Sequence, residues 1–244
     1  MPADPQHAPL DQAALLSALR ARVARLEGAG RAQHDAAPVP LCDGLRLPGG
    51  GLARAALHEV LATAPGCGAA FCAMLLGRSG GTVLWISGSG EAWPPGLARF
   101  GLAPARLVLV RAMQWQDALW AMEEALRCAA VTGALLEVPE EGEAGLDLTA
   151  TRRLQLAAEA GGALGLVLRP DALGLGQSAA TTRWRVGSLG GEGRGLGDPR
   201  WQLELLRARG GRPGGPWAVT WRAAAGTLEL DEEATAQAGQ RASA

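Results

Sequence analysis

The chain has 244 residues, of which 48% are hydrophobic, 19% charged and 4% aromatic, and its 23 basic and 24 acidic residues leave a formal charge of −1. This length is enough for one globular domain with a sizeable core and an added arm. The near-neutral charge argues against a surface that binds polyanions throughout. Because the sequence has no run of 18 apolar residues, and residues 1–9 do not resemble a secretory signal, we expect a cytoplasmic protein without a membrane span.

All of the basic residues are arginines, so the sequence contains no lysine. This excludes Schiff-base chemistry on a lysine and the lysine of a phosphate-binding loop. The four cysteines and three histidines do not have the spacing of a metal site, and Ala62 stands where a zincin helix beginning at His58 would need its second histidine. We therefore expect no metal ion and reduced thiols.

Residues 10–27 are predicted to form a helix that is capped by Asp11 and ended by Gly28. A narrow apolar stripe runs along it, formed by Leu16, Leu19, Val23 and Leu26. An isolated helix with such a stripe needs a partner, either its own core or another chain. Residues 28–40, rich in Ala, Gly and Pro, are predicted to be a linker, so the arm and linker together span residues 1–40.

Short apolar runs alternate with helical patterns between residues 57 and 168. The predicted strands are residues 57–61, 83–86, 107–110, 134–138 and 164–168. The predicted helices are residues 69–76, 94–100, 115–129 and 149–160. Strands alternating with helices of this length predict βαβ units and a largely parallel sheet flanked by helices, that is, an α/β fold.

The helical pattern is clearest in residues 115–129. One face carries the apolar side chains of Trp115, Leu119, Met122 and Leu126, and we expect this face to pack against the core. Glu123 and Arg127, four residues apart, are predicted to pair on an exposed turn.

The pattern changes after residue 168, where apolar runs are separated by glycine-rich turns without helices between them. These runs are residues 183–186, 201–209, 217–222 and 227–230. They predict antiparallel hairpins that extend the sheet, with Trp201, Leu203 and Leu205 on one face of their strand. Residues from Asp231 onward are acidic and then small and polar, so the expected domain spans residues 41–230 and a disordered tail spans residues 231–244.

Together these features resemble the RecA-like ATPase core and, more closely, the ImuA family of accessory proteins from bacterial mutagenic repair cassettes. The stretches that are similar to ImuA follow one order over nearly the whole chain after residue 45. They are LHEV at 57–60, VLWIS at 83–87, PGLARFGLAPARLVLVRA at 95–112, DALWAMEEALRC at 117–128, DLTATRRLQLAAEA at 147–160, TTRWRV at 181–186 and LELLRARGGRPGGPW at 203–217.

The chain departs from an active RecA-like ATPase at the positions that would hold nucleotide. The stretch corresponding to the phosphate loop, ATAPGCGAA at 62–70, keeps Gly66 and Gly68 but has neither the lysine nor the following hydroxyl. Ser89 stands where the water-orienting acid is expected, with Glu91 two residues later, and Glu137 falls where a Walker B strand has its metal-linked aspartate. The resemblance therefore implies a degenerate nucleotide pocket, with no catalytic residue and no cofactor.

With no catalytic site expected, the remaining candidate for a functional site is a surface that binds a partner. Residues 181–222 hold eight arginines and three acidic residues, and arginine interleaved with tryptophan suits protein contacts and stacking on single-stranded DNA. We single out Arg183, Trp184 and Arg185 here. In RecA-like filaments the strand resembling residues 203–209 faces the neighbouring subunit, which adds Arg207 and Arg209. The alternative is that the tryptophans fill the core and the arginines form a solvated face.

The resemblance to the ImuA family implies action with ImuB, a catalytically inactive Y-family polymerase homologue, and with an error-prone DnaE-type polymerase in damage-induced translesion synthesis. The leading hypothesis is a non-catalytic adaptor that binds ImuB. RecA and a second copy of the chain are further partners that this hypothesis allows, and contact with DNA stays open. Two alternatives are a SulA-like inhibitor of the division protein FtsZ and a RecA-like protein that binds nucleotide or single-stranded DNA.

Overall fold

The computed structural model describes residues 37–45, 47–90, 92–139, 146–173, 176–190 and 197–242. Within these residues one mixed sheet has nine strands in the order β3-β2-β4-β5-β1-β6-β7-β8-β9. The strands are β1 (Ala56–Ala62), β2 (Thr82–Ser87), β3 (Leu107–Arg111), β4 (Val131–Glu137), β5 (Leu164–Pro170), β6 (Thr182–Leu189), β7 (Arg200–Ala208), β8 (Gly214–Arg222) and β9 (Thr227–Asp231).

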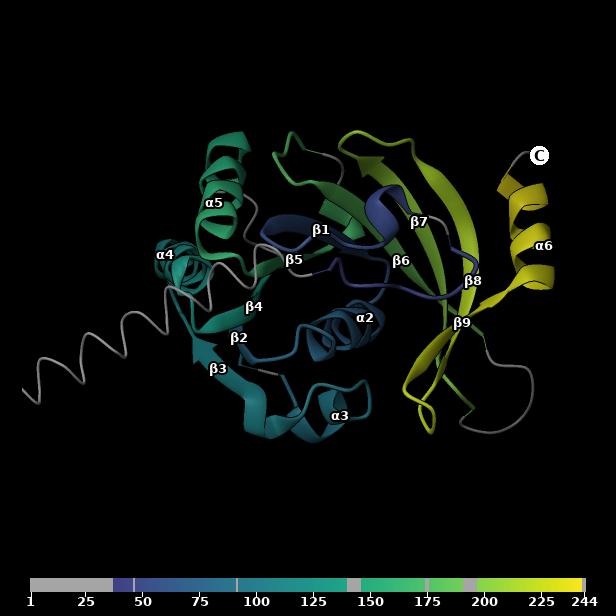
Figure 1. Cartoon of the computed structure of the whole chain (residues 1–244), viewed down its shortest axis with the longest axis horizontal. Helices are drawn as coiled ribbons and strands as arrows, with labels where there is room; N and C mark the ends of the chain where they lie inside the picture. Colours follow the sequence, from purple (N-terminus) through teal and green to yellow (C-terminus); the bar gives the residue numbers. More distant parts are fainter. Residues whose placement is uncertain are drawn as a thin grey trace, which may run out of the picture.

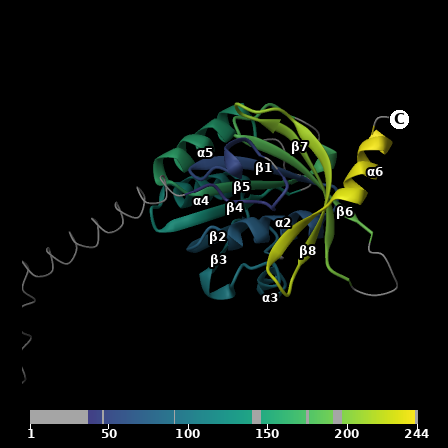
Figure 2. The same ribbon diagram turned by 45° about the vertical axis from the view of Figure 1, so that its right-hand side comes forward.

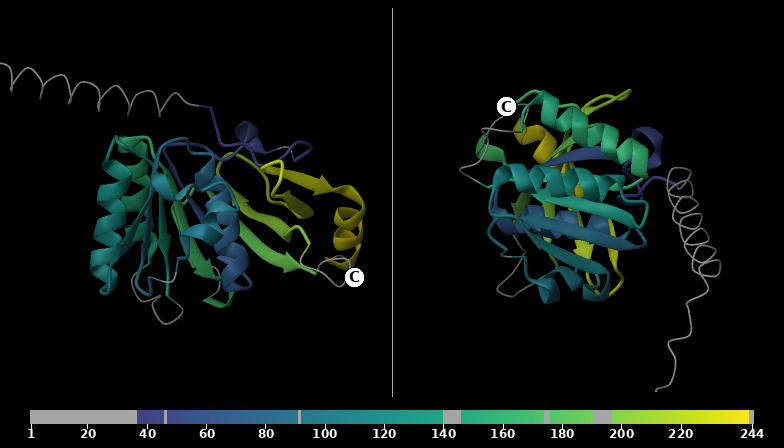
Figure 3. Two further views of the ribbon diagram at one scale, coloured as in Figure 1. Left: turned by 90° about the horizontal axis from the view of Figure 1, so that it is seen from below. Right: turned by 90° about the vertical axis from the view of Figure 1, so that its left-hand side faces the viewer.

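Helices cover both faces of the parallel part of the sheet (Figures 1 and 3). The α-helices are α2 (Pro65–Gly77), α3 (Pro94–Ala98), α4 (Trp115–Arg127), α5 (Leu148–Gly161) and α6 (Glu232–Ala242). The described residues also form three short 3-10 helices, η1 (Pro48–Gly50), η2 (Pro104–Arg106) and η4 (Asp171–Leu173). The helices α2 and α3 lie on one face, and α4 and α5 lie on the other (Figure 3). In the described part of the chain, no helix is both long and apolar enough to cross a membrane.

Two hydrophobic clusters separate these layers. One lies between α2 and the sheet and includes Phe71, Trp85 and Trp184, and the other lies under α4 and α5 and includes Met122 and Leu126. The predicted parallel sheet is confirmed, since β1 pairs with β5, β5 with β4, and β4 with β2, all in parallel. The apolar face predicted for residues 115–129 is confirmed as well, because its side chains belong to the second cluster.

The predicted antiparallel extension is also present. The pairs β6–β7, β7–β8 and β8–β9 are antiparallel, and Trp201, Leu203 and Leu205 are buried on one face of β7. One feature was not predicted: β6 does not pair with β5 but lies beside β1, in parallel. The extension therefore continues the parallel sheet instead of forming a separate layer (Figure 2).

Both predicted ends of the domain need correction. The linker was expected to extend to Pro40, but Val39 is fully buried and forms an antiparallel bridge with Leu52. The tail was expected to be disordered from Asp231, but that residue ends β9 and residues 232–242 form α6, which packs against β8 (Figure 2). The helix forms because the Asp231 carboxylate accepts the amide of Ala234, and it is anchored because the Thr235 hydroxyl accepts the amide of Ala218.

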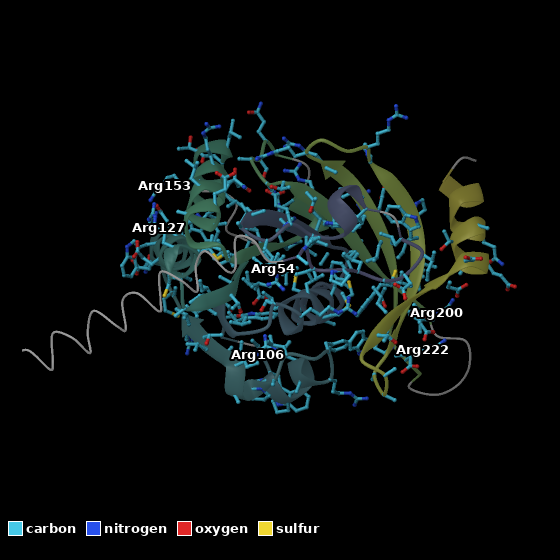
Figure 4. All side chains as sticks on the ribbon, viewed as in Figure 1. Arg54, Arg106, Arg127, Arg153, Arg200 and Arg222 are labelled. Carbon is cyan, nitrogen blue, oxygen red and sulfur yellow. The ribbon has the colours of Figure 1, made fainter. Side chains whose placement is uncertain are left out.

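The predicted pair of Glu123 and Arg127 exists, but it is not on an exposed turn. Glu123 is buried between α4 and α5, and its carboxylate accepts hydrogen bonds from Arg127 on its own helix and from Arg153 on α5. Figure 4 shows both arginines at the outer side of these two helices. The pair thus helps to join the two helices on this face of the sheet.

Candidate functional site

A cavity of about 610 Å³ lies at the carboxyl ends of β1, β2, β4 and β5. This edge is where open α/β sheets bind their ligands, because loops diverge there and leave a crevice. The polar side chains that line the cavity are those of Thr63, Ser87, Ser89, Glu137 and Arg169. Two of the positions predicted for a degenerate nucleotide pocket, Ser89 and Glu137, are among the lining residues.

The connection from β1 to α2 consists of only Thr63 and Ala64, and α2 begins directly at Pro65. Gly66 and Gly68, predicted to be remnants of a phosphate loop, therefore lie in the first turn of the helix, and neither lines the cavity. A Cβ at residue 68 would lie 2.5 Å from the Cβ of Ala62 and 2.6 Å from Cδ1 of Leu168. Gly68 is thus required for close packing of helix on strand, while the space around Gly66 is open.

Ser89 and Glu137 both line this cavity. The Glu137 carboxylate ends β4, and its Oε2 accepts a hydrogen bond of 3.3 Å from Nε1 of Trp85 on β2. The Ser89 hydroxyl lies 3.2 Å from that of Ser87, which in turn accepts the amide of Gly90. Glu91 lies outside the described residues.

Arg169 was missed by the sequence analysis, although a charged residue at the end of the apolar run 164–168 was a signal for it. The residue is 3% exposed and lines the cavity at the end of β5. Burial lowers its pKa from the usual range of arginine, and the nearby charge of Glu59 raises that pKa in part. Glu59 on β1 is fully buried, and its Oε2 accepts a hydrogen bond of 2.6 Å from Nε of Arg183.

The predicted partner surface is corrected by this burial. Trp184 is fully buried in the core and Arg183 is 7% exposed, so neither is available to a partner in this structure. Arg185 is partly exposed, but its guanidinium binds Asp171 and Glu204, and the hydrogen bond with Asp171 raises its pKa. Arg183 is buried because its guanidinium donates hydrogen bonds to the carboxylate of Glu59 and to the carbonyl of Gly176, which satisfy it inside the protein.

Two of the predicted surface residues do reach solvent. Arg207 and Arg209 lie at the carboxyl end of β7, where they donate hydrogen bonds to the carbonyls of Ser178 and Ala179. The predicted stripe of the arm lies outside the described residues; it comprises Leu16, Leu19, Val23 and Leu26. Among the residues that the structure describes, no group of three His, Cys, Asp or Glu side chains is arranged to hold a metal ion.

No protein-family model matches the chain. The RadB recombinase structure matches with a TM-score of 0.56 and 14% identity over 74% of this chain and 93% of RadB, which shows a RecA-like fold. Protein ImuA from two strains of Caulobacter vibrioides is 38% identical over 72% of this chain and 79% of the relative. With this identity over most of both chains, in addition to the RecA-like fold, the chain belongs to the ImuA family.

Proposed function

We propose that this protein is a non-catalytic RecA-like adaptor in DNA-damage-induced mutagenic translesion synthesis, which binds ImuB and assists an error-prone DnaE-type polymerase. The observation that carries this proposal is the two-residue connection between β1 and α2, next to a cavity at the carboxyl ends of the parallel strands. Membership of the ImuA family supports the accessory role.

The chemistry of the cavity supports the absence of ATPase activity. A phosphate-binding loop needs several consecutive amides that surround the phosphates and a lysine that neutralises their charge. Here the connection has two residues, Pro65 removes one amide from the first turn of α2, and the sequence has no lysine. Phosphoryl transfer depends on several groups acting together, so the loss of this set removes most of the rate.

The test is complex formation by the purified full-length protein with ImuB and with the DnaE-type polymerase, measured by size-exclusion chromatography with and without ATP and Mg²⁺. We expect a complex whose affinity is the same under both conditions, and ATP hydrolysis no faster than in buffer. Complex formation that requires ATP, hydrolysis above background, or the absence of any complex would each contradict the adaptor role.

The exposed arginines of β7 and the predicted stripe of the arm are the surfaces that we propose for these partners. Arg207→Glu reverses one exposed charge at the end of β7. We expect it to weaken the complex about tenfold, because reversing a rim charge replaces attraction with repulsion. Arg99→Glu, which reverses the charge of another exposed arginine directly after α3, is the control and should leave the affinity unchanged. Equal affinities for both variants would exclude Arg207 from the interface.

A further inference from the structure

A second cavity of about 310 Å³ lies at the opposite end of the sheet from the candidate nucleotide pocket. It is enclosed by residues 47–53, which precede β1, and by the ends of β6 and β7 that face them. Figure 1 shows the segment before β1, in purple, close to β6 and β7. The lining side chains are mostly apolar and include Leu47, Leu52, Trp184, Leu205 and Ala208.

The floor of this cavity is held in place by a chain of hydrogen bonds. Nε1 of Trp184 donates to the hydroxyl of Thr182 at 2.9 Å, and that hydroxyl lies 2.7 Å from Nδ1 of His58. Nε2 of His58 lies 2.8 Å from the carbonyl of Ala53, which can only accept. Nε2 of His58 therefore carries the proton, and Nδ1 accepts a hydrogen bond from the Thr182 hydroxyl. Every polar side-chain atom in this series of hydrogen bonds thus has a partner.

This floor is also uncharged. Burial lowers the pKa of His58 to about 4, so its imidazole is neutral at physiological pH. The Trp184 indole is further held by Trp217, whose ring centre lies 6.3 Å away. Because this apolar floor is already ordered, an apolar side chain can bind to it without an entropic cost of ordering the floor.

The rim of the cavity is positively charged. Among the described residues that line it, Arg209 is the charged one, and its side chain is 51% exposed. One of its terminal nitrogens donates to the carbonyl of Ala179, and the other lies 3.9 Å from the carboxylate of Glu159, a long contact for an ion pair. The guanidinium is thus positioned by a backbone carbonyl while most of its charge stays available to solvent.

We propose that this cavity binds an acidic segment of a partner protein, which inserts one apolar side chain between η1 and β7 and places a carboxylate against Arg209. The volume suits one large side chain, since it lies at the lower end of the range for ligand sites. An apolar anchor in a pocket with a complementary charge at its rim is the usual composition of an interaction hot spot. The inference deepens the proposed adaptor role, because Arg209 belongs to the β7 surface proposed there for a partner. The peptide test below uses neither ImuB nor the polymerase, so the two proposals fail separately.

The test begins with a displayed library of random peptides of about 12 residues, selected on the full-length protein. We expect the selected peptides to share an aromatic or aliphatic residue with Asp or Glu beside it. Synthetic peptides are then titrated against the protein by fluorescence anisotropy. Ala208→Phe fills the cavity and Arg209→Gln removes the charge while keeping an amide for Ala179, and each should raise the Kd by about tenfold or more.

Arg212→Gln is the matched control, because Arg212 is exposed and close in sequence but is not among the residues that line the cavity; it should change the Kd by less than about threefold. Thermal unfolding of each variant establishes that it is folded. Peptides without acidic residues, or peptides that bind both cavity variants as tightly as the original protein, would overturn the proposal. So would loss of self-association in Ala208→Phe without any peptide selected, since the occupant would then be a second copy of the chain.

Discussion

Gly68 and Gly66 stand two residues apart in the first turn of α2, yet their surroundings differ completely. A methyl group at residue 68 would overlap Ala62 and Leu168, whereas nothing lies within 4 Å of the corresponding point at residue 66. The two glycines therefore serve different purposes despite the sequence similarity to a phosphate loop. Gly68 lets the helix approach the sheet, and this approach closes the space that a phosphate loop would need.

Substitution by alanine should therefore change the free energy of unfolding differently at the two positions. We expect Gly68→Ala to destabilise the protein by about 2 kcal/mol, because the added methyl overpacks the contact between helix and strand. Gly66→Ala should be neutral or stabilise it by up to about 1 kcal/mol, because alanine restricts the unfolded chain. Urea denaturation of both variants measures the difference. A stability loss of the same size at both positions would show that packing is not what requires Gly68.

His58 provides a prediction on pH. It is fully buried, and burial lowers its pKa to about 4, below the value of 6.5 expected in the unfolded chain. The unfolded state therefore binds the proton more tightly, so this contribution to stability is fully present above pH 6.5 and is lost as the pH falls through about 4. The difference in pKa corresponds to about 3 kcal/mol.

The test is to measure the slope of the free energy of unfolding against pH between pH 4 and pH 6.5. His58→Gln removes the titrating group, and we expect a shallower slope than in the original protein over this range only. The remaining slope reports the carboxylates, which are the same in both proteins. Identical slopes would mean that His58 is not buried in its neutral form.

At the scale of elements, arginines determine how α2 ends. The guanidinium of Arg106 donates to the carbonyls of Gly77 and Gly81, and that of Arg54 donates to the carbonyls of Arg78 and Ser79. Both are labelled in Figure 4, close to α2. Of these carbonyls, that of Gly77 is the last of α2, and the others follow the helix. Because carbonyls at a helix end lack partners within the helix and carry partial negative charge, Arg106 satisfies that of Gly77, and both guanidinium groups oppose the helix dipole.

Arg106→Ala should therefore destabilise the protein by about 2 kcal/mol, since partly buried carbonyls lose charged donors. Arg99→Ala changes an exposed arginine in the same part of the molecule and should cost less than about 0.5 kcal/mol. Chemical denaturation gives both values, and hydrogen exchange at the end of α2 should increase in the first variant alone. Unchanged exchange there would contradict the role of Arg106 in ending the helix.

At the scale of the whole molecule, the segment that precedes β1 contributes to the stability of the domain. Val39 and Leu41 are buried, Val39 exchanges two hydrogen bonds of 2.8 Å with Leu52, and Arg78 donates to the carbonyls of Pro40 and Leu41. This segment is thus part of the domain and joins the region around η1 to the rest of the core.

Truncation distinguishes this segment from the arm. A chain that begins at residue 37 should unfold cooperatively, because it retains every contact of Val39 and Leu41 described above. A chain that begins at residue 45 should lose at least about 3 kcal/mol, because two buried side chains are removed from the core. Circular dichroism during thermal unfolding compares the two. Equal stability of both chains would place the boundary of the domain after residue 44.

Much of the fold follows from local patterns. The alternation of apolar runs with amphipathic stretches predicts the parallel sheet and its helices, because each pattern has the period of one type of element. The positions of Ser89 and Glu137 at one edge follow as well, since parallel strands end at a common edge. The two-residue connection after β1 does not follow, because proline and glycine in residues 65–68 predict a loop by local preference. The helix nevertheless begins at Pro65, where proline is tolerated, and Gly68 is required there by its packing on the sheet.

The sequence by itself determined the RecA-like class of the sheet, the lack of a phosphate-binding lysine and the family, since these depend on composition, period and order along the chain. Tertiary structure decided which of the side chains predicted to form a partner surface reach solvent. The alternation of Arg183, Trp184 and Arg185 shows two faces of a strand, but burial of Arg183 depends on Glu59, over a hundred residues earlier. It also decided that residues after Asp231 form a helix, because the contact of Thr235 with Ala218 exists only once β8 is in place. Local sequence cannot specify contacts between residues that folding alone brings together.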